Sequence, residues 1–231
     1  MSFSLIIPIY NEEDNIKILI EQINTSLNNK NYNHEIIFIK DGITDDSYNV
    51  LIKLKQNNIS IITNDRNYGQ SYSLMKGIKI AKNDLIVIMD GNLQNNPIDI
   101  IKLLNIYLKN NFNLVGGIRN KRKDSKLKII SSYIANFIRQ IILKDDYIDT
   151  GCSLKVFEKK IFLSLPYFDR IHRLLPALFK EMGYKTYFTN VDHRPRFYGK
   201  SKYGTLLRLI WGIRDIIRVI IIIKKLKNHN A

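Results

Sequence analysis

The sequence predicts an α/β fold in which a mostly parallel β-sheet is flanked by helices. Two observations lead to this prediction. Short, continuously apolar runs alternate with longer stretches whose apolar residues recur every three or four positions. Strands that are apolar on both faces need cover on both sides, which is typical of parallel sheets. With 231 residues, the chain is long enough for one sizeable domain with a buried core.

Five strands and four helices are expected in the first half of the chain. The predicted strands are Ser4–Pro8, Glu35–Lys40, Ile59–Thr63, Leu85–Met89 and Leu114–Gly117. The predicted helices are Asp14–Leu27, Ser47–Lys55, Gln70–Ala81 and Ile98–Lys109. Because each helix returns the chain to the start of the next strand, the carboxyl ends of these strands should meet at one edge of the sheet.

The second half is less regular. It should contain, in order, a helix at Ser125–Leu143, a turn and short strand in "DTGCSLKVF", helices at Glu158–Leu163 and His172–Met182, and a strand near Lys185–Thr189. The basic loop "DHRPRFYGKSKYG" then leads to a C-terminal helix. We therefore expect one domain over residues 1–204 and a basic amphipathic helix and tail over residues 205–231.

The charge of the chain indicates an anionic partner. Its 36 Lys and Arg residues exceed its 21 Asp and Glu residues and give a formal net charge of +15. Nucleic acid, anionic lipid and a phosphorylated substrate would all satisfy that charge. The sequence carries no nucleic-acid recognition motif, so nucleic acid is not an expected partner. One cysteine, Cys152, excludes an intramolecular disulfide and fits a reducing compartment.

The tail "LLRLIWGIRDIIRVIIIIKKLK" is predicted to be an amphipathic helix in a membrane interface. Its polar face should hold Arg208, Asp215, Arg218 and Lys225, with Leu209, Ile213, Ile216, Ile217, Ile220 and Ile223 largely opposite. A helix that covers the domain's own core, or a dimer seam, is the alternative. No uncharged run reaches the roughly 18 residues of a spanning helix. The N-terminal "SLIIPIY" indicates a strand and not a signal peptide, so we expect a peripheral protein on the cytoplasmic face of a membrane.

Four polar loops follow predicted strands, and ligands of open α/β sheets bind at that edge. The loops are "PIYNEED", "KDGITDD", "NDRNYGQ" and "DGNLQNNP". In the last of them, Asp90 offers a carboxylate, and Asn92 and Gln94 offer amide oxygens. Oxygen ligands suit Mg²⁺ and Mn²⁺, and a substrate diphosphate could complete so weak a site. An Asx-type turn that leads into a helix near Pro97 is the structural alternative.

Other residues at this edge have similar double interpretations. The carboxylate of Asp41 could accept a hydrogen bond from a nucleobase N–H, or Asp41 and Gly42 could form a simple turn. Glu12 could bind a ligand or cap a helix. Cationic side chains suited to phosphate binding follow in the second half, namely Arg119, Arg122, Lys128, His172, Arg173, Arg194, Arg196, Lys200 and Lys202. No zinc spacing, Walker loop, GxGxxG or GxSxG motif is present.

At this point the sequence resembles glycosyltransferase family 2, which has the GT-A fold, and within it the branch of dolichyl- and polyprenyl-phosphate mannosyl- or glucosyltransferases. The resemblance runs from Ser4 to about Lys225. It rests on an ordered set of motifs, "SLIIPIYNEEDNI", "KDGITDDS", "NYGQSYSLMKGI", "DGNLQNNPIDI", "GGIRNKRKDS", "DTGCSLKVF", "HRLLPAL" and "HRPRFYGKSKYG". It implies an inverting enzyme that moves a sugar from a GDP- or UDP-linked donor to a polyprenyl phosphate at the membrane surface.

The resemblance also implies residue roles. Nucleoside contacts would come from Pro8, Tyr10, Glu12 and Asp41. Metal and donor diphosphate would be held by Asp90, Asn92 and Gln94, with Arg119 and Lys128 on the phosphates. Asp149 would lie near the donor sugar and acceptor. The acceptor phosphate would meet Arg122, Ser132, Arg196, Ser201 and Lys202, and the catalytic set would be Asp90, Asp149, Arg196 and Lys202.

Two positions depart from the family pattern. Lys40 stands where the family usually has the first residue of Asp-Asp-Gly-Ser, and Asn92 stands where it usually has a second metal-binding Asp. A weakened Mg²⁺ or Mn²⁺ site is therefore expected. The alternatives are a family 2 enzyme acting on a sugar hydroxyl in cell-envelope polysaccharide or lipopolysaccharide synthesis, and a degenerate, non-catalytic subunit. Some relatives carry two spanning helices beyond this point, so a membrane partner protein is a further expected partner.

Overall fold

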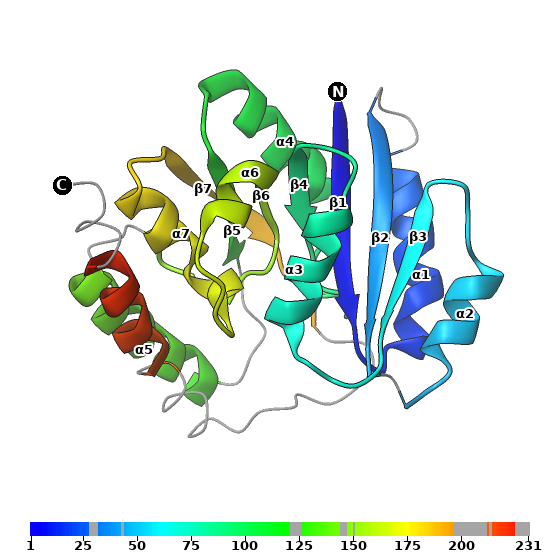
Figure 1. Cartoon of the computed structure of the whole chain (residues 1–231), viewed down its shortest axis with the longest axis horizontal. Coiled ribbons are helices and arrows are strands. Elements are labelled where there is room, and N and C mark those ends of the chain that lie inside the picture. Colours follow the sequence, from blue (N-terminus) through cyan, green and yellow to red (C-terminus); the bar gives the residue numbers. More distant parts are fainter. Residues whose placement is uncertain are drawn as a thin grey trace.

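A seven-stranded β-sheet runs through the protein, and helices lie on either side of it (Figure 1). The computed structural model describes residues 1–27, 32–42, 44–120, 126–143, 147–149, 151–195, 212 and 214–224, except for the side chains of 126–132 and 135. The strands are β1 (Ser2–Ile9), β2 (Asn33–Asp41), β3 (Ile59–Asn64), β4 (Leu85–Ile88), β5 (Leu114–Asn120), β6 (Lys155–Glu158) and β7 (Thr186–Asp192). Their order in the sheet is β3-β2-β1-β4-β6-β5-β7.

The expected α/β fold with a mostly parallel sheet is confirmed. Strand β1 pairs in parallel with β2 and β4, β2 with β3, and β5 with β7. Strand β6 alone among them runs antiparallel, between β4 and β5. From β1 the chain moves outward to β2 and β3 and then returns to place β4 on the other side of β1. The strand order therefore reverses between β1 and β4, and ligands of open α/β sheets bind outside the carboxyl ends of the strands at such a point.

Helices cover both faces of the sheet. They are α1 (Glu13–Leu27), α2 (Ser47–Lys53), α3 (Gln70–Ile80), α4 (Ile98–Asn110), α5 (Lys126–Leu143), α6 (Lys159–Ser164) and α7 (Ile171–Glu181). Successive residues of β1 point to opposite faces, so Leu5 and Ile7 join a core with α1, α2 and α4, whereas Ile6 joins a core with α3, α6 and α7. The boundaries differ from the expected ones by a few residues. Strands β5 and β7 each continue three residues further than expected, so that β5 ends at Asn120 and contains Arg119.

Residues 214–224 form a further helix that packs on the sheet's α3–α7 side. Ile216 and Val219 are buried in that core. The placement of Asp215 on a polar face was wrong, because Asp215 is only 3% exposed and accepts a hydrogen bond of 2.7 Å from Arg170 Nε. One face of this helix therefore covers the domain's own core. Within the described part of the chain, no helix has the length and apolar character needed to cross a membrane.

Helix α3 approaches the sheet closely because Gly77 has no side chain. A Cβ atom at this position would lie 2.7 Å from Ile39 Cδ1 and 2.8 Å from Ile6 Cγ2. Both isoleucines are fully buried, so they have little room to move.

We expect Gly77→Ala to lower the free energy of unfolding by about 1–3 kcal/mol, since overpacking outweighs the gain in helix propensity. Gly212→Ala is the matched control, because Gly212 is also helical and has open space around it. Urea unfolding followed by circular dichroism measures both variants. A Gly77→Ala protein as stable as the parent would contradict the close approach of α3.

Candidate functional site

The parallel order of β2, β1 and β4 brings the residues expected at the carboxyl edge together. Pro8 lies in β1, and Tyr10 and Glu12 follow it directly. Asp41 ends β2, and Asp90 comes two residues after β4. Because β1 is flanked by β2 on one side and β4 on the other, these side chains come from three adjacent strands of one sheet edge. Glu12 directly precedes α1, and its backbone oxygen accepts from Asn15 N at 2.9 Å and from Ile16 N at 3.2 Å, as expected for a residue at the cap position.

The carboxylate of Asp90 accepts a hydrogen bond from helix α3. Gln70, the first residue of α3, donates from Nε2 to Asp90 Oδ1 at 2.8 Å. Loss of solvation raises the pKa of Asp90, whereas the nearby Ser153 hydroxyl, the hydrogen bond from Gln70 and the positive charges of Lys155 and Arg119 act against that rise. The side chain of Gln70 does not cap its own helix, because Gly69 is the N-cap residue and no side-chain hydrogen bond caps α3.

Lys155 is a site residue that sequence reasoning missed. It is 0% exposed at the start of β6, where it is paired with Ile88 and Gly116. Its Nζ donates to the backbone oxygen of Cys152 and lies 5.6 Å from the ring centroid of Tyr147. Burial lowers the pKa of Lys155, and the charges of Asp149 and Asp90 are among those that raise it. The one available signal was a lysine inside the otherwise apolar "SLKVF".

The loop after β4 forms the turn that was considered as the alternative to a metal site. Asn92 Oδ1 accepts from the backbone N of Gln94 at 3.1 Å, and Asn92 Nδ2 donates to Gln94 Oε1 at 3.1 Å. Leu93 between them has a left-handed φ of 61°. The side-chain amides of Asn92 and Gln94 are therefore hydrogen-bonded to each other in this turn. Asp90 lies two residues before Asn92 in the chain. The described residues hold no cluster of three or more His, Cys, Asp or Glu side chains that could bind a metal.

The donor set still suits a hard cation that a ligand helps to hold. Asp90 supplies one carboxylate, and Asn92 and Gln94 supply neutral amide oxygens, which are the ligand types of Mg²⁺ and Mn²⁺. One formal negative charge is a weak attraction for a divalent ion. The residues present therefore fit a cation whose remaining ligands are phosphate oxygens and water.

The same loop is fastened to the end of β7. Asn95 forms an isolated β-bridge with His193, and Arg194 N donates to Gln94 O at 2.9 Å. Ser153 Oγ donates to Asn95 Oδ1 at 2.8 Å, which ties the loop to the segment before β6 as well. The loop that would hold a metal is thus fixed by contacts with two other segments, residues 193–194 and Ser153.

Asp41 supports the loop before α3 in the structure. Its Oδ1 accepts from Asn64 Nδ2 and Tyr68 N, both at 2.9 Å, and its Oδ2 accepts from Gly69 N at 2.8 Å. Gly42 follows with φ 62°, and a Cβ atom there would lie 2.2 Å from Asn67 N. The carboxylate therefore positions the backbone at residues 67–69. Its contact with a nucleobase stays a prediction.

Arg119 and Asp149 form a bidentate ion pair. Arg119 donates from Nε to Asp149 Oδ2 at 2.8 Å and from Nη2 to Oδ1 at 2.7 Å, and its backbone N reaches Oδ2 at 3.0 Å. Gly151 makes room for the guanidinium, since a Cβ atom there would lie 2.3 Å from Nη2. This explains the glycine in "DTGC". The two residues, predicted to have separate roles, act on each other directly.

His172 is not a phosphate-binding cation in this structure. It is buried, and its Nδ1 lies 2.7 Å from Ser71 Oγ. Burial, followed by the nearby charges of Lys155, Arg173 and Arg170, lowers the pKa of His172 well below its ordinary value. The imidazole is therefore neutral and links α7 to the first turn of α3.

Several of the predicted phosphate-binding residues belong to parts of the chain that are not described. Arg122, Arg196, Lys200, Ser201 and Lys202 lie outside the described residues. Lys128 and Ser132 lie in α5, but their side chains are not described. Their roles toward phosphate groups stay predictions.

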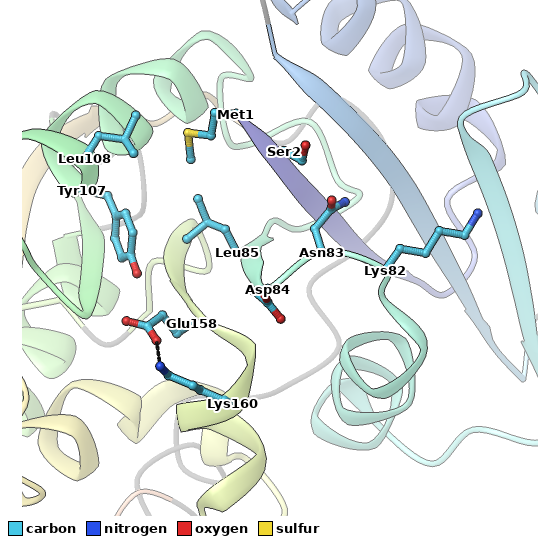
Figure 2. A pocket seen from close by; sticks show the side chains of 10 residues that line it. All are labelled: Met1, Ser2, Lys82, Asn83, Asp84, Leu85, Tyr107, Leu108, Glu158 and Lys160. Carbon is cyan, nitrogen blue, oxygen red and sulfur yellow. Dashed lines mark ion pairs between the residues drawn. The ribbon is translucent and has the colours of Figure 1, made fainter.

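A separate hollow lies at the opposite edge of the sheet (Figure 2). Its lining includes Met1 and Ser2 at the start of β1, Leu85 at the start of β4, and the ion pair of Lys160 with Glu158. Leu85 is the first residue of β4, whereas Asp90 follows the last residue of that strand. The hollow thus lies at the amino ends of β1 and β4, which run parallel. The hollow is therefore distinct from the candidate site.

Comparison with known proteins gives the fold and the family. The mannosyl-3-phosphoglycerate synthase of Rubrobacter xylanophilus has a TM-score of 0.75 at 11% identity and covers 100% of this chain and 75% of its own. A glucosyl-3-phosphoglycerate synthase of Mycobacterium tuberculosis, solved with Mn²⁺, UDP and glucosyl-3-phosphoglycerate, has a TM-score of 0.67 at 17% identity and covers 94% and 77%. At these identities the likeness confirms the fold, an α/β fold of the GT-A type.

A family model described as glycosyl transferase family 2 matches residues 4–165. The chain therefore belongs to glycosyltransferase family 2. It is 30% identical over 217 residues to the undecaprenyl-phosphate 4-deoxy-4-formamido-L-arabinose transferase of Yersinia enterocolitica, and 29% identical to that of Edwardsiella ictaluri. Each match covers 93% of this chain and 66% of the relative, so the chain spans just under two thirds of the relatives' length.

The buried, neutral state of His172 predicts a pH dependence of stability. Below the ordinary histidine pKa of about 6.5, the unfolded chain binds a proton at this position and the folded chain does not. The free energy of unfolding contributed by this group therefore falls as the pH drops below 6.5, by up to about 1.4 kcal/mol per pH unit. His172→Gln should show a shallower decline than the parent in urea unfolding between pH 5 and pH 8. Equal slopes would mean that His172 is charged in the folded protein.

Proposed function

We propose that this protein transfers a sugar from a GDP- or UDP-linked donor to a polyprenyl phosphate, with inversion at the anomeric carbon. The observation that carries the proposal is the carboxyl edge of β1 and β4, where the positive charges of Lys155 and Arg119 act on Asp90. The family match supports glycosyl transfer, and the relatives named as undecaprenyl-phosphate transferases support a lipid phosphate acceptor.

In this proposal the nucleoside lies over the ends of β1 and β2. Pro8, Tyr10, Glu12 and Asp41 would contact it. The first two loops are already tied together there, since Asn11 Nδ2 donates to Thr44 Oγ1 at 2.9 Å. The donor diphosphate lies toward β4 and β5, where Arg119 and Lys128 would contact its phosphates.

Mg²⁺ or Mn²⁺ would be held by Asp90, Asn92 and Gln94 together with the diphosphate. When bound, the cation would stabilise the negative charge that develops on the leaving nucleoside diphosphate. The Mn²⁺ in the solved synthase from Mycobacterium tuberculosis supports metal use by proteins of this fold. Gln70, which donates to Asp90, would leave one carboxylate oxygen engaged and the other available.

The acceptor sets the demand on acid–base chemistry. A phosphate monoester has a second pKa of about 6, so its oxygen is already anionic near neutral pH and can attack the anomeric carbon directly. The nucleoside diphosphate leaves with the electron pair of the broken bond, and no proton has to be removed from the nucleophile. Asp149, fixed by Arg119, would orient the donor sugar and acceptor. Arg122, Ser132, Arg196, Ser201 and Lys202 would bind the acceptor phosphate.

The protein would work as a peripheral protein on the cytoplasmic face of a membrane, because a polyprenyl phosphate resides in the bilayer. The domain of residues 1–204 would carry the site, and the segment of residues 205–231 would lie at the interface. A membrane partner protein is a further proposed component.

A non-catalytic subunit is the competing proposal, and Lys40 and Asn92 are its evidence. The position of Lys40 weakens it. The ammonium of Lys40 lies 4.8 Å from the ring centroid of Tyr48 in α2, so its charge is directed at that ring. The charged pair of Arg119 with Asp149 is also intact.

Calorimetric titration with GDP and UDP, each with and without Mn²⁺, tests donor binding. We expect one nucleotide to bind, and to bind more tightly with Mn²⁺. Asn92→Asp adds a second carboxylate, so it should lower the Mn²⁺ concentration needed for half-maximal nucleotide binding by about tenfold. An Asn92→Asp protein with unchanged metal dependence would contradict the assignment of this turn to the metal. No binding of either nucleotide under any condition would favour the non-catalytic subunit.

A transfer assay tests the acceptor. With the nucleotide sugar that matches the bound nucleotide, a short polyprenyl phosphate should accept the sugar, whereas the corresponding polyprenol should not, because its hydroxyl lacks the anionic oxygen. Asp149→Asn should reduce the turnover number by about a hundredfold or more, as expected for a misplaced reacting group. Transfer to a saccharide hydroxyl in place of the lipid phosphate would support the polysaccharide alternative.

A further inference from the structure

Helix α5 turns its apolar side chains toward solvent. Six large apolar residues of this helix are 44–73% exposed, namely Tyr133, Ile134, Phe137, Ile138, Ile141 and Ile142. They recur at intervals of one, three, one, three and one, which places all six on one side of an α-helix. We call this side the outer face of α5. A surface helix of a globular protein normally directs such a stripe at the core.

The inner side of the same helix carries polar residues. Among its described side chains, Asn136 is 8% exposed and Arg139 is 4% exposed, and the apolar Leu143 at its end is 8% exposed. Arg139 donates from Nη2 to the backbone oxygen of Tyr147, and its guanidinium carbon lies 6.0 Å from the Tyr147 ring centroid. Tyr147 is itself fully buried and donates to Gly117 O at 3.0 Å. These contacts fix the rotation of α5 about its axis, because a helix turned the other way would lose them.

A fixed, outward apolar stripe of this size requires an apolar environment outside the protein. Soluble monomers rarely expose contiguous apolar patches larger than a few hundred Å², and larger patches mark protein or membrane contacts. The same part of the molecule carries more apolar surface, since Ile217 and Ile221 of helix 214–224 are 54% and 51% exposed. Leu143 at the end of α5 and Val219 of helix 214–224 belong to one hydrophobic cluster, and Figure 1 shows both helices at the same end of the molecule.

The charges next to this apolar surface decide which environment it meets. Arg214 and Lys224 are exposed and Arg218 is half-buried, and all three lie on the helix that carries Ile217 and Ile221. The whole chain has a formal net charge of +15. Apolar side chains beside cations, on a helix too polar to span, are the pattern of a surface that enters an anionic lipid interface. A protein partner would have no need of the net charge, and a second copy would repel it.

We propose that the outer face of α5, together with Ile217 and Ile221, inserts into the headgroup region of an anionic membrane. This inference rests on the proposed function, for which the acceptor is a lipid phosphate. The chain enters α5 from Arg119 at the end of β5 and leaves it toward Asp149. A membrane-held α5 would therefore set the height of that ion pair above the bilayer and present the lipid's phosphate to the site from the membrane side.

Vesicle flotation with the full chain tests the proposal, using phosphatidylcholine alone and phosphatidylcholine mixed with phosphatidylglycerol. The parent should bind the anionic vesicles and bind the neutral ones more weakly. The double variant Phe137→Asp/Ile141→Asp should bind anionic vesicles at least about tenfold less, since it places two carboxylates where apolar groups enter the interface.

The matched control is Ile80→Asp/Leu108→Asp. Ile80 in α3 and Leu108 in α4 are 48% and 51% exposed, so the control makes the same chemical change at similar exposure away from α5. It should bind vesicles like the parent. If the aspartate pair in α5 does not fold, as judged by circular dichroism, the serine pair at residues 137 and 141 is measured in its place.

Two results would overturn the proposal. One is vesicle binding by the α5 variant within about twofold of the parent, because the surface would then not touch lipid. The other is a parent that ignores both kinds of vesicle but forms a dimer that the α5 variant breaks, as measured by light scattering; the outer face would then be a contact between two copies. Titration with GDP and UDP in the absence of vesicles reports on the proposed function independently, so its failure is distinguishable from a failure of membrane binding.

Discussion

The burial of one cation constrains the whole candidate site. Lys155 lies in the interior strand β6 with no exposed surface. An unpaired ammonium in that position would lower the free energy of unfolding by several kcal/mol. Asp90 and Asp149 supply the opposing charges, and Tyr147 supplies a ring face. The carboxylates of the site are therefore needed by the fold as well as by any ligand. The cost of burying Lys155 is offset by Asp90 and Asp149, whose charges act on it at the carboxyl edge of the sheet.

The parts of the molecule that follow from short-range patterns could be predicted from the sequence. The parallel strands and their helices follow from the alternation of apolar runs with amphipathic stretches, and the carboxyl edge follows from that topology. The polar residues Asp41, Asp90 and Asn92 were found because they directly follow such runs. Periodicity alone could not place β6 antiparallel between β4 and β5, since strand direction depends on the path of the chain through α5.

The residues that the sequence did not reveal owe their roles to contacts between distant segments. Lys155 acts on Asp90 from β6, the strand next to β4, and Gln70 reaches the same carboxylate from α3. His172 resembled a phosphate-binding cation because "HR" is a basic pair, but its packing against Ser71 makes it neutral. Asp215 has the spacing expected for a polar helix face, but it is buried because it accepts a hydrogen bond from Arg170. Side-chain partners of this kind are separated by 20 to 101 residues, and a local pattern carries no information about them.

The surfaces of α3 and α5 differ in which amino-acid substitutions they tolerate. Gly77 meets two fixed isoleucines, so its position accepts no larger side chain without strain. The outer face of α5 would meet fluid lipid, which has no shape of its own to match. Its positions should drift freely among Ile, Leu, Val, Phe, Met and Tyr between related proteins, while the inward Arg139 and its partner Tyr147 stay paired. In a sequence alignment, α5 would then look variable on its apolar side and invariant on its polar side, the reverse of the usual record left by a surface helix.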